Sequence, residues 1–172
     1  MKTASFHRPL VLIFMGVAGS GKTTVASRFA KKAGATFYEG DDFHPPANIA
    51  KMSSGTPLTD GDREQWLQTL REMVTRALAA NEVAVLTCSA LKAKYRERLQ
   101  GGDPRVKFVH LTCPRALLEE RLKSRRGHFM PPGLLDSQLA ALEAPTDALT
   151  FSCELPPEAI VTALVQALSR PD

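Results

Sequence analysis

The chain contains no apolar run long enough to span a membrane. Its first apolar stretch, Leu10–Met15, covers six residues and leads into a polar, glycine-rich segment without a cleavage-site pattern. Internal repeats, low-complexity segments and inter-domain linkers are also missing from the 172 residues, a length that suits one domain with its own core. We therefore expect a single domain over residues 1–172, located in the cytoplasm and without a membrane partner.

Cysteine is scarce, and its spacing does not match that of metal sites. The three cysteines, Cys88, Cys113 and Cys153, form an odd number and lie far apart in the sequence. Each lies in or beside an apolar stretch, where a thiol packs as a small hydrophobic side chain. We therefore expect reduced core thiols in a cytoplasmic protein.

Long runs of one charge are absent as well. The formal net charge is +4, and the basic residues are spread over several segments. A positive balance of this size suits small anionic ligands as well as nucleic acid, and the missing basic run disfavours nucleic acid. We expect no nucleic-acid partner.

The most informative feature that is present is a complete phosphate-binding loop, G-x-x-x-x-G-K-[ST], at residues 16–23. Its glycines let successive backbone N–H groups point at phosphate oxygens, and the helix expected behind it adds a positive N-terminal end. Lys22 is expected to reach the β- and γ-phosphates, and Thr23 to bind Mg²⁺ through its hydroxyl. The sequence therefore predicts a nucleoside triphosphate site formed by Gly16, Val17, Ala18, Gly19, Ser20, Gly21, Lys22, Thr23 and Thr24.

Apolar runs typical of buried strands alternate with segments of helical periodicity along the whole chain. Strands are expected at Leu10–Met15, Thr36–Glu39, Val83–Cys88, Val106–Thr112 and Leu149–Cys153. Helices are expected at Lys22–Ala33, Asp62–Ala80, Ala93–Leu99, Pro114–Arg126, Leu134–Leu142 and Glu158–Leu168. The proline-containing stretch Gly40–Asp60 is expected to be rich in loops. This order predicts a three-layer α/β/α fold with a central parallel five-stranded sheet, whose ligands bind beyond the carboxyl ends of the strands.

An acidic cluster follows the second expected strand, opposite the phosphate-binding loop. It contains Glu39, Asp41, Asp42 and His44. A phosphotransferase needs a group there that orients an acceptor hydroxyl and accepts its proton late in transfer. We assign that role to Asp41, while Glu39 or Asp42 could act on Mg²⁺ through water. A solvated acidic turn that caps the next helix is the alternative.

Cations and hydroxyl groups follow in the segments expected to wall an acceptor pocket. Lys51 and Arg63 could bind a carboxylate or sugar hydroxyls, although Arg63 could equally pair with a neighbouring aspartate on the surface. After the third strand, Ser89 and Lys92 offer a hydroxyl and a cation. That strand ends without an acidic residue, which disfavours the arrangement of motor ATPases.

A basic helix leads into a segment with glycine and proline hinges. Arg121 and Arg125 lie four residues apart and share a helix face. The segment at about 121–142 is expected to be a helical lid that closes over ATP, brings both arginines onto the transferring phosphoryl group and excludes water. A surface helix with a kink is the alternative.

Several strings resemble those of the gluconate kinase (gluconokinase) family, and the likeness as a whole covers the chain from Leu10 to Pro145. They are Gly40–Pro45, Asn48–Met52, Gly55–Leu58, Asp60–Arg63, Trp66-Leu67, Cys88–Lys92, Tyr95-Arg96, Arg125–Met130 and Ser137-Gln138. The departures are modest. Residues 45–48 lack the basic side chains of some members, and Gln65 stands where proline is common.

The resemblance implies an ATP:D-gluconate 6-phosphotransferase with a P-loop kinase fold like that of nucleoside-monophosphate and shikimate kinases. It also implies D-gluconate and ATP or ADP as partners, Mg²⁺, and a homodimer. The implied acceptor-binding residues are Asp41, His44, Lys51, Arg63, Ser89, Lys92 and His128. Catalysis would then consist of positioning and electrostatics by Lys22, Asp41, Arg121 and Arg125. The adenine contacts stay unassigned, because the residues after Pro145 carry little of the resemblance.

Two alternatives remain open. A kinase of the same fold could act on shikimate or a nucleoside monophosphate, although the strings at His44-Pro45 and Cys88–Lys92 argue against this. A nucleotide-dependent switch that transfers nothing is the second alternative. A guanine switch would need an N-K-x-D string, and neither Asn48 nor Asn81 begins one.

Overall fold

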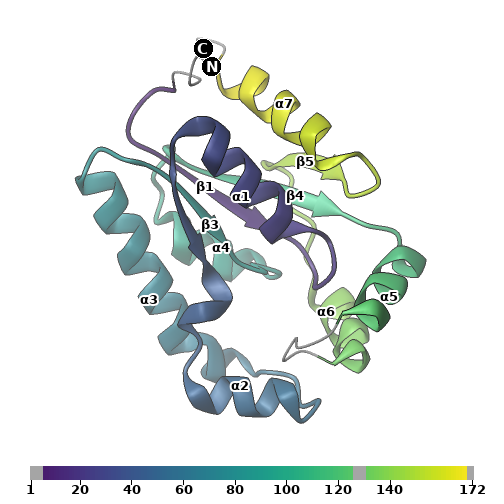
Figure 1. Ribbon diagram of the computed structural model, residues 1–172. Coiled ribbons are helices and arrows are strands. Elements are labelled where there is room, and N and C mark those ends of the chain that lie inside the picture. The colour runs from purple at the N-terminus through teal and green to yellow at the C-terminus, as the bar shows by residue number, and fades with distance from the viewer. Residues whose placement is uncertain (1–5, 126–130, 170–172) are drawn as a thin grey trace.

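The computed structural model describes residues 6–125 and 131–169, which form a parallel sheet between helices (Figure 1). The strands are β1 (Leu10–Met15), β2 (Thr36–Glu39), β3 (Val83–Thr87), β4 (Val106–Thr112) and β5 (Leu149–Ser152). The helices are α1 (Lys22–Ala33), α2 (Pro46–Ser53), α3 (Asp60–Ala79), α4 (Ala93–Gln100), α5 (Arg115–Ser124), α6 (Leu135–Ala141) and α7 (Pro157–Leu168), with short 3₁₀ segments η1 (Gly40–Phe43) and η2 (Pro132–Leu134). Within the described ranges, no helix combines the length and the apolar character needed to cross a bilayer.

The sheet has the strand order β2-β3-β1-β4-β5, and all neighbouring strands are parallel. Every residue of the central strand β1 is buried, as expected of a strand that is covered on both faces. Helices α1 and α7 cover the face of the sheet that carries Phe14, and α3 and α4 cover the face that carries Ile13. The three-layer α/β fold with five parallel strands, predicted from the sequence, is confirmed.

Local sequence signals place the ends of the helices near their predicted positions. Helix α1 ends at Gly34, whose φ of 63° is easy for glycine and unfavourable for other residues. Helix α3 begins after Thr59 with a capping box. The Thr59 hydroxyl accepts from the Asp62 N–H, and the Asp62 carboxylate accepts from the Thr59 N–H. The N-cap of α3 is therefore Thr59.

The expectation of a loop-rich stretch over Gly40–Asp60 is wrong in part, because η1 and α2 lie within it. Its prolines suggest a loop, yet Pro46 lies in the first turn of α2. A residue there does not donate a backbone hydrogen bond within the helix, so the missing N–H of proline costs nothing. The same residue that breaks a helix interior thus starts this helix.

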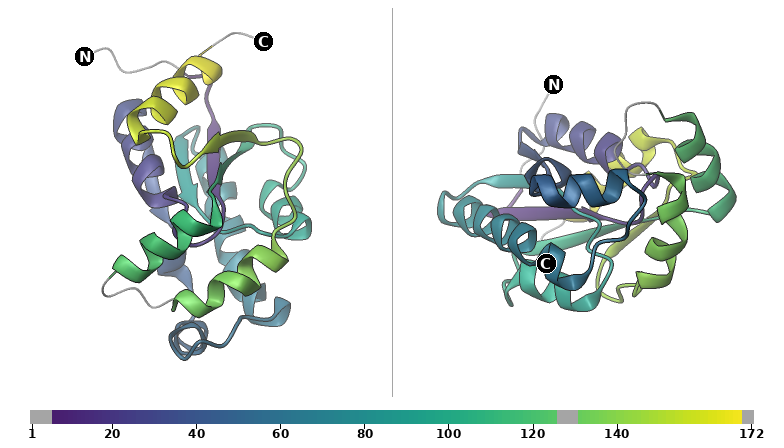
Figure 2. Two further views of the ribbon diagram at one scale, coloured as in Figure 1. Left: turned by 90° about the vertical axis from the view of Figure 1, so that its right-hand side faces the viewer. Right: turned by 90° about the horizontal axis from the view of Figure 1, so that it is seen from below.

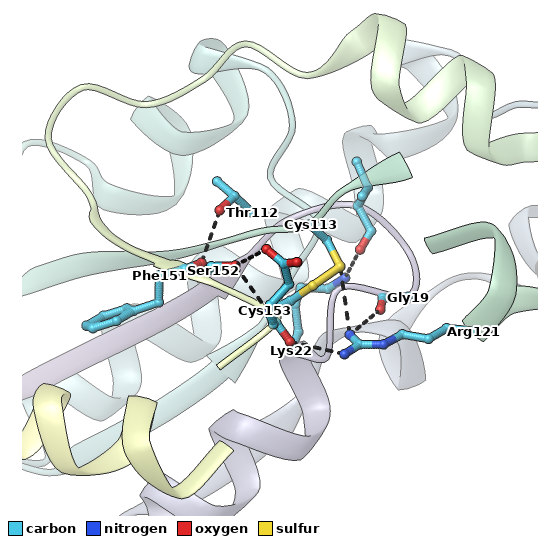
Figure 3. Close-up of a disulfide and its surroundings, with 10 residues drawn as sticks. Gly19, Lys22, Thr112, Cys113, Arg121, Phe151, Ser152 and Cys153 are labelled. Carbon is cyan, nitrogen blue, oxygen red and sulfur yellow. Dashed lines mark hydrogen bonds between the residues drawn. A yellow bond between two sulfur atoms is a disulfide. The ribbon is translucent and has the colours of Figure 1, made fainter. Parts of the chain in front are cut away.

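The expectation of reduced thiols is wrong for two of the three cysteines. Cys113 and Cys153 form a disulfide with their Cα atoms 5.2 Å apart, whereas Cys88 is free and buried (Figure 3). The sheet register explains the pairing. Thr112 in β4 lies opposite Ser152 in β5, so the next residue of each strand lies beside the other. This proximity depends on strand pairing between residues 40 positions apart.

The carboxyl ends of the strands face α2, α5 and α6 (Figure 1). The view from below shows α2 with α5 and α6 to its right at this end of the sheet (Figure 2). The phosphate-binding loop follows β1 and the acidic cluster follows β2 at the same end, so the fold brings the two predicted functional segments together.

Candidate active site

The loop between β1 and α1 has a conformation that depends on glycine. Gly16 has a φ of +142°, and a Cβ there would lie 2.8 Å from the carbonyl oxygen of Leu111. Lys22 Nζ donates to the carbonyl oxygens of Gly16 and Val17, each at 3.0 Å. Burial lowers the pKa of the Lys22 ammonium, and the nearby carboxylate of Asp41 opposes this. The N-terminus of α1 and the ammonium group of Lys22 therefore lie together at this loop, which suits a phosphate chain.

Hydroxyl groups join this loop to the end of β2. Thr23 Oγ1 donates to Oε2 of Glu39 at 2.6 Å, and the Thr87 hydroxyl donates to the other oxygen of that carboxylate. These oxygens are hard donors of the kind that Mg²⁺ prefers. Within residues 6–125 and 131–169, no group of three or more His, Cys, Asp or Glu side chains could hold a metal. Thr23 and Glu39 therefore fit Mg²⁺ that is held mainly by nucleotide phosphates and water, as is usual for this ion.

The acidic cluster is fixed through the backbone of Gly40. A Cβ at this residue would lie 1.9 Å from the carbonyl oxygen of Thr87, so only glycine permits so close an approach. The Gly40 N–H donates to Thr87 Oγ1 at 3.1 Å, and its carbonyl oxygen accepts from the indole N–H of Trp66 at 2.7 Å. The next residue, Asp41, lines the cavity beside the loop, whereas Asp42 is exposed.

His44 is a buried, neutral imidazole with a defined tautomer. Its ring stacks on Trp66, with centroids 4.1 Å apart and planes 16° from parallel. Burial, together with the positive charge of Arg63, lowers its pKa to about 4. The amide nitrogen of Asn48 lies 3.3 Å from Nδ1 and donates to it, which leaves the proton on Nε2. Nε2 lies 3.9 Å from Oδ1 of Asp41 and so presents its N–H on the side of the acidic cluster.

One cavity, here named the transfer cleft, joins the loop to the acidic cluster. The predicted site residues that line it are Ala18, Gly19, Gly21, Lys22, Thr23, Asp41, His44, Arg63, Ser89 and Arg125. The other lining residues are Glu39, Met52, Leu58, Trp66, Leu91 and Gln138. A phosphate-binding loop thus shares one space with a carboxylate, a neutral imidazole and two guanidinium groups.

Two of the predicted acceptor cations lie outside this cleft. Lys51 pairs with Asp62 at 2.8 Å, and Lys92 pairs with Asp60 at 2.9 Å. Hydrogen bonds from Lys51 lower the pKa of Asp62 to about 2, so the carboxylate stays charged and the pair persists at neutral pH. In the structure both lysines are held in these ion pairs and neither lines the cleft, whereas Arg63, also expected as an acceptor cation, does line it.

The two lid arginines do not act side by side. A second cavity, here named the outer cleft, is lined by Gly19, Ser20, Gly21, Thr24, Val25, Arg121, Ser124, Arg125, Cys153, Glu154, Leu155, Pro156, Pro157 and Ile160. Arg121 lines only the outer cleft, whereas Arg125 lines both clefts. Helix α5 ends at Ser124, and the backbone of Arg125 is extended, so the two residues no longer share a helix face. In this structure Arg121 therefore does not line the transfer cleft, and the predicted site residue His128 lies outside the described residues.

Gln138 is a functional candidate that the sequence did not assign. Its Oε1 accepts a hydrogen bond of 2.7 Å from the N–H of Ala18 in the phosphate-binding loop, and its side chain is buried. Helix α6 thus contacts the loop directly. The sequence does hold a signal for this role, because Gln138 is a polar residue on the same helix face as Leu134, Leu135 and Leu142. A polar side chain on a buried apolar face needs a hydrogen-bond partner.

Comparisons with known proteins identify a family model, relatives and solved structures that this chain resembles. A family model described as an AAA domain matches residues 11–145. A gluconokinase from Gluconobacter oxydans is 46% identical, over 96% of this chain and 94% of that protein. The crystal structure of a gluconokinase from Sinorhizobium meliloti superposes with a TM-score of 0.82 at 42% identity, over 94% and 93% of the two chains. A shikimate kinase from Bacteroides thetaiotaomicron shares the fold, with a TM-score of 0.70 at 22% identity over 94% and 99%.

Proposed function

Because the chain belongs to the gluconokinase family, we propose that it transfers the γ-phosphoryl group of ATP to gluconate. The observation that carries this proposal is the transfer cleft, in which Lys22 and Asp41 line the same space. A phosphate-binding loop supplies the donor side, and a carboxylate beside it suits an acceptor hydroxyl.

The nucleotide would lie across both clefts. Gly19, Gly21 and Arg125 line the outer and the transfer cleft, so a phosphate chain that follows the loop passes from one to the other. The apolar wall of the outer cleft, with Leu155 and Pro156, suits an adenine ring, which the sequence left without contacts. Arg121 then belongs to nucleotide binding, and Arg125 to the γ-phosphoryl group.

On the acceptor side, Asp41 holds the hydroxyl that attacks and takes its proton late in the transfer. His44 donates from Nε2 to an acceptor oxygen, since Asn48 occupies its other nitrogen. Arg63 binds the carboxylate of gluconate, because Lys51 and Lys92 are engaged with aspartates outside the cleft. Ser89 adds a hydroxyl to the same wall.

The proposal has finer parts that follow from family membership and from the site. The phosphorylated oxygen is the 6-hydroxyl, at the end of gluconate opposite its carboxylate. Thr23 and, by way of water, Glu39 would hold Mg²⁺, which would neutralise charge on the phosphates. We also propose one kinase domain over residues 1–172, a lid at about 121–142, a homodimer and a cytoplasmic location.

An acceptor panel tests the function. Sugar acids, sugars and shikimate are offered with ATP and Mg²⁺ in an ADP-coupled assay, and the position of the new phosphate is read by NMR. We expect gluconate to give the highest kcat/KM and a product phosphorylated at the 6-oxygen. Activity on shikimate without activity on gluconate would favour the same-fold alternative, and ATP turnover that ignores every acceptor would favour a switch.

A further inference from the structure

The disulfide between Cys113 and Cys153 joins two segments at the nucleotide site. Cys113 directly follows β4, at the start of the segment that leads into α5, and Cys153 begins the connection from β5 to α7. The second connection supplies a wall of the outer cleft from Cys153 to Pro157. The inference below rests on the proposed role of that cleft in binding ATP.

One arginine connects the disulfide to the phosphate-binding loop (Figure 3). Arg121 donates through Nη1 to the carbonyl oxygen of Gly19 at 3.1 Å and to Sγ of Cys113 at 3.8 Å. Through Nη2 it donates to the carbonyl oxygen of Cys153 at 3.1 Å. The guanidinium therefore touches the loop and both cysteines, so the position of each depends on the others.

The two sulfur atoms differ in access and surroundings. Cys153 is buried, with 6% of its surface exposed, whereas Cys113 is only partly buried. A reductant therefore meets Cys113 first. The guanidinium of Arg121 lies beside the Cys113 sulfur, and a partly exposed site next to a cation is typical of reactive cysteines. Cys88 differs from both, because burial raises its pKa to about 12 and keeps its thiol unreactive.

We propose that Cys113 and Cys153 form a thiol–disulfide exchange site whose redox state sets the affinity for ATP. In a cytoplasmic protein, a disulfide is usually transient and either catalytic or redox-sensing. In the bonded state, the outer-cleft wall from Cys153 to Pro157 is tied to the end of β4. In this bonded state the Cys153 N–H also donates to the Thr112 carbonyl oxygen at 2.7 Å. Reduction removes the covalent tie and leaves only non-covalent contacts of this kind between the two segments.

The exchange is balanced with a dithiol as reductant. One thiolate of the dithiol attacks Cys113 Sγ, which forms a mixed disulfide and releases Cys153 as a thiolate that takes up a proton. The second thiolate of the dithiol then attacks the dithiol's first sulfur, which is bonded to Cys113 in the mixed disulfide. This closes the disulfide of the reductant and releases Cys113 as a thiolate. The dithiol loses two electrons and becomes a disulfide, and the protein gains two thiols. A small-molecule or protein disulfide reverses the reaction.

The test compares one preparation in two redox states. The protein is oxidised with excess oxidised glutathione or reduced with dithiothreitol, and thiols are counted after denaturation. We expect one thiol in the oxidised form and three in the reduced form. Calorimetric titration with a non-hydrolysable ATP analogue should then give a Kd about 3- to 10-fold higher for the reduced form, because its cleft wall must be ordered on binding.

Variants separate this site from the rest of the chain. Cys113→Ser and Cys153→Ser should bind the analogue like the reduced wild type under both conditions, and Cys88→Ala should keep the redox response. Three thiols after oxidation, or equal Kd values in the two states of the wild type, would overturn the proposal. Because the titration contains no gluconate, a wrong assignment of the acceptor would leave its outcome unchanged.

Discussion

At the scale of single residues, neighbouring groups set the tautomer, the protonation and the position of the polar side chains in the transfer cleft. Asn48 sets the tautomer of His44, Arg63 and burial keep that imidazole neutral, and the backbone of Gly40 holds Asp41 beside the loop. Lys51 and Lys92 are paired elsewhere, so the proposed acceptor chemistry rests on Asp41, His44, Arg63 and Ser89.

The role of Asp41 as proton acceptor predicts a selective loss in Asp41→Asn. An amide keeps the shape of the side chain but cannot take the proton, so kcat should fall about 10²-fold or more, with a normal melting temperature. Steady-state kinetics measure this. The matched control is Asp42→Asn, since Asp42 is exposed and next in the chain, and it should stay near wild-type kcat. Near-normal turnover of Asp41→Asn would show that Asp41 is not the proton acceptor.

The burial of His44 predicts a pH dependence of stability. Its pKa is about 4 in the folded chain and near 6.5 when unfolded, so the unfolded state binds more protons between these values. Stability is therefore lost as pH falls through this window. The contribution of His44 is about 2 kcal/mol between pH 7 and pH 5. Urea unfolding at both pH values should show a smaller loss in His44→Gln, whereas His7→Gln, at an exposed histidine, should retain the wild-type slope.

If Arg63 binds the carboxylate of gluconate, its substitution should change KM for gluconate and leave KM for ATP nearly unchanged. Arg63→Gln removes the charge-assisted hydrogen bond, which should raise KM for gluconate about 10- to 100-fold and change KM for ATP little. Lys51→Gln and Lys92→Gln serve as matched controls because their ammonium groups lie outside the cleft. A larger rise in KM for gluconate in either lysine variant than in Arg63→Gln would show that the lysine binds the acceptor.

At the scale of elements, the contact between α6 and the phosphate-binding loop joins the proposed lid to the proposed donor site. Gln138 accepts from the Ala18 N–H, and around it Val17, Leu118 and Leu135 form a small apolar cluster. Helices α5 and α6 are therefore packed on the loop, so a change in either helix is transmitted to the residues that hold phosphate.

The Gln138→Leu substitution removes the acceptor of this buried hydrogen bond and leaves the Ala18 N–H unpaired. The lost hydrogen bond should lower kcat/KM for ATP about 10-fold. Ser137→Ala is the matched control, because the Ser137 hydroxyl donates to Leu134 within the lid and does not line the cleft. Equal kinetics for the two variants would show that Gln138 does not position the loop.

The elements also show what sequence can and cannot predict. Apolar runs predicted β1 and β4 with their observed bounds, because a buried central strand has few alternatives. The disulfide, the pairing of Lys92 with Asp60 and the bond of Gln138 to Ala18 were not predicted, since each joins distant parts of the chain. Their formation depends on strand register and helix packing, which local patterns do not encode.

At the scale of the whole molecule, two clefts meet at one loop. The parallel sheet places the loop after β1 and the acidic cluster after β2 at the same edge, with β3 between these strands. The transfer cleft and the outer cleft share Gly19, Gly21 and Arg125, so a donor and an acceptor can meet where the clefts join. The central claim is that this junction transfers phosphate to gluconate.

The most direct test of this claim is the rate of ATP turnover with and without gluconate, measured on the same preparation with Mg²⁺. A site built for transfer leaves water poorly placed, so gluconate should raise ADP formation by about 10²-fold or more, with one phosphorylated gluconate for each ADP. An unchanged rate in saturating gluconate, from protein that binds the ATP analogue, would contradict the account.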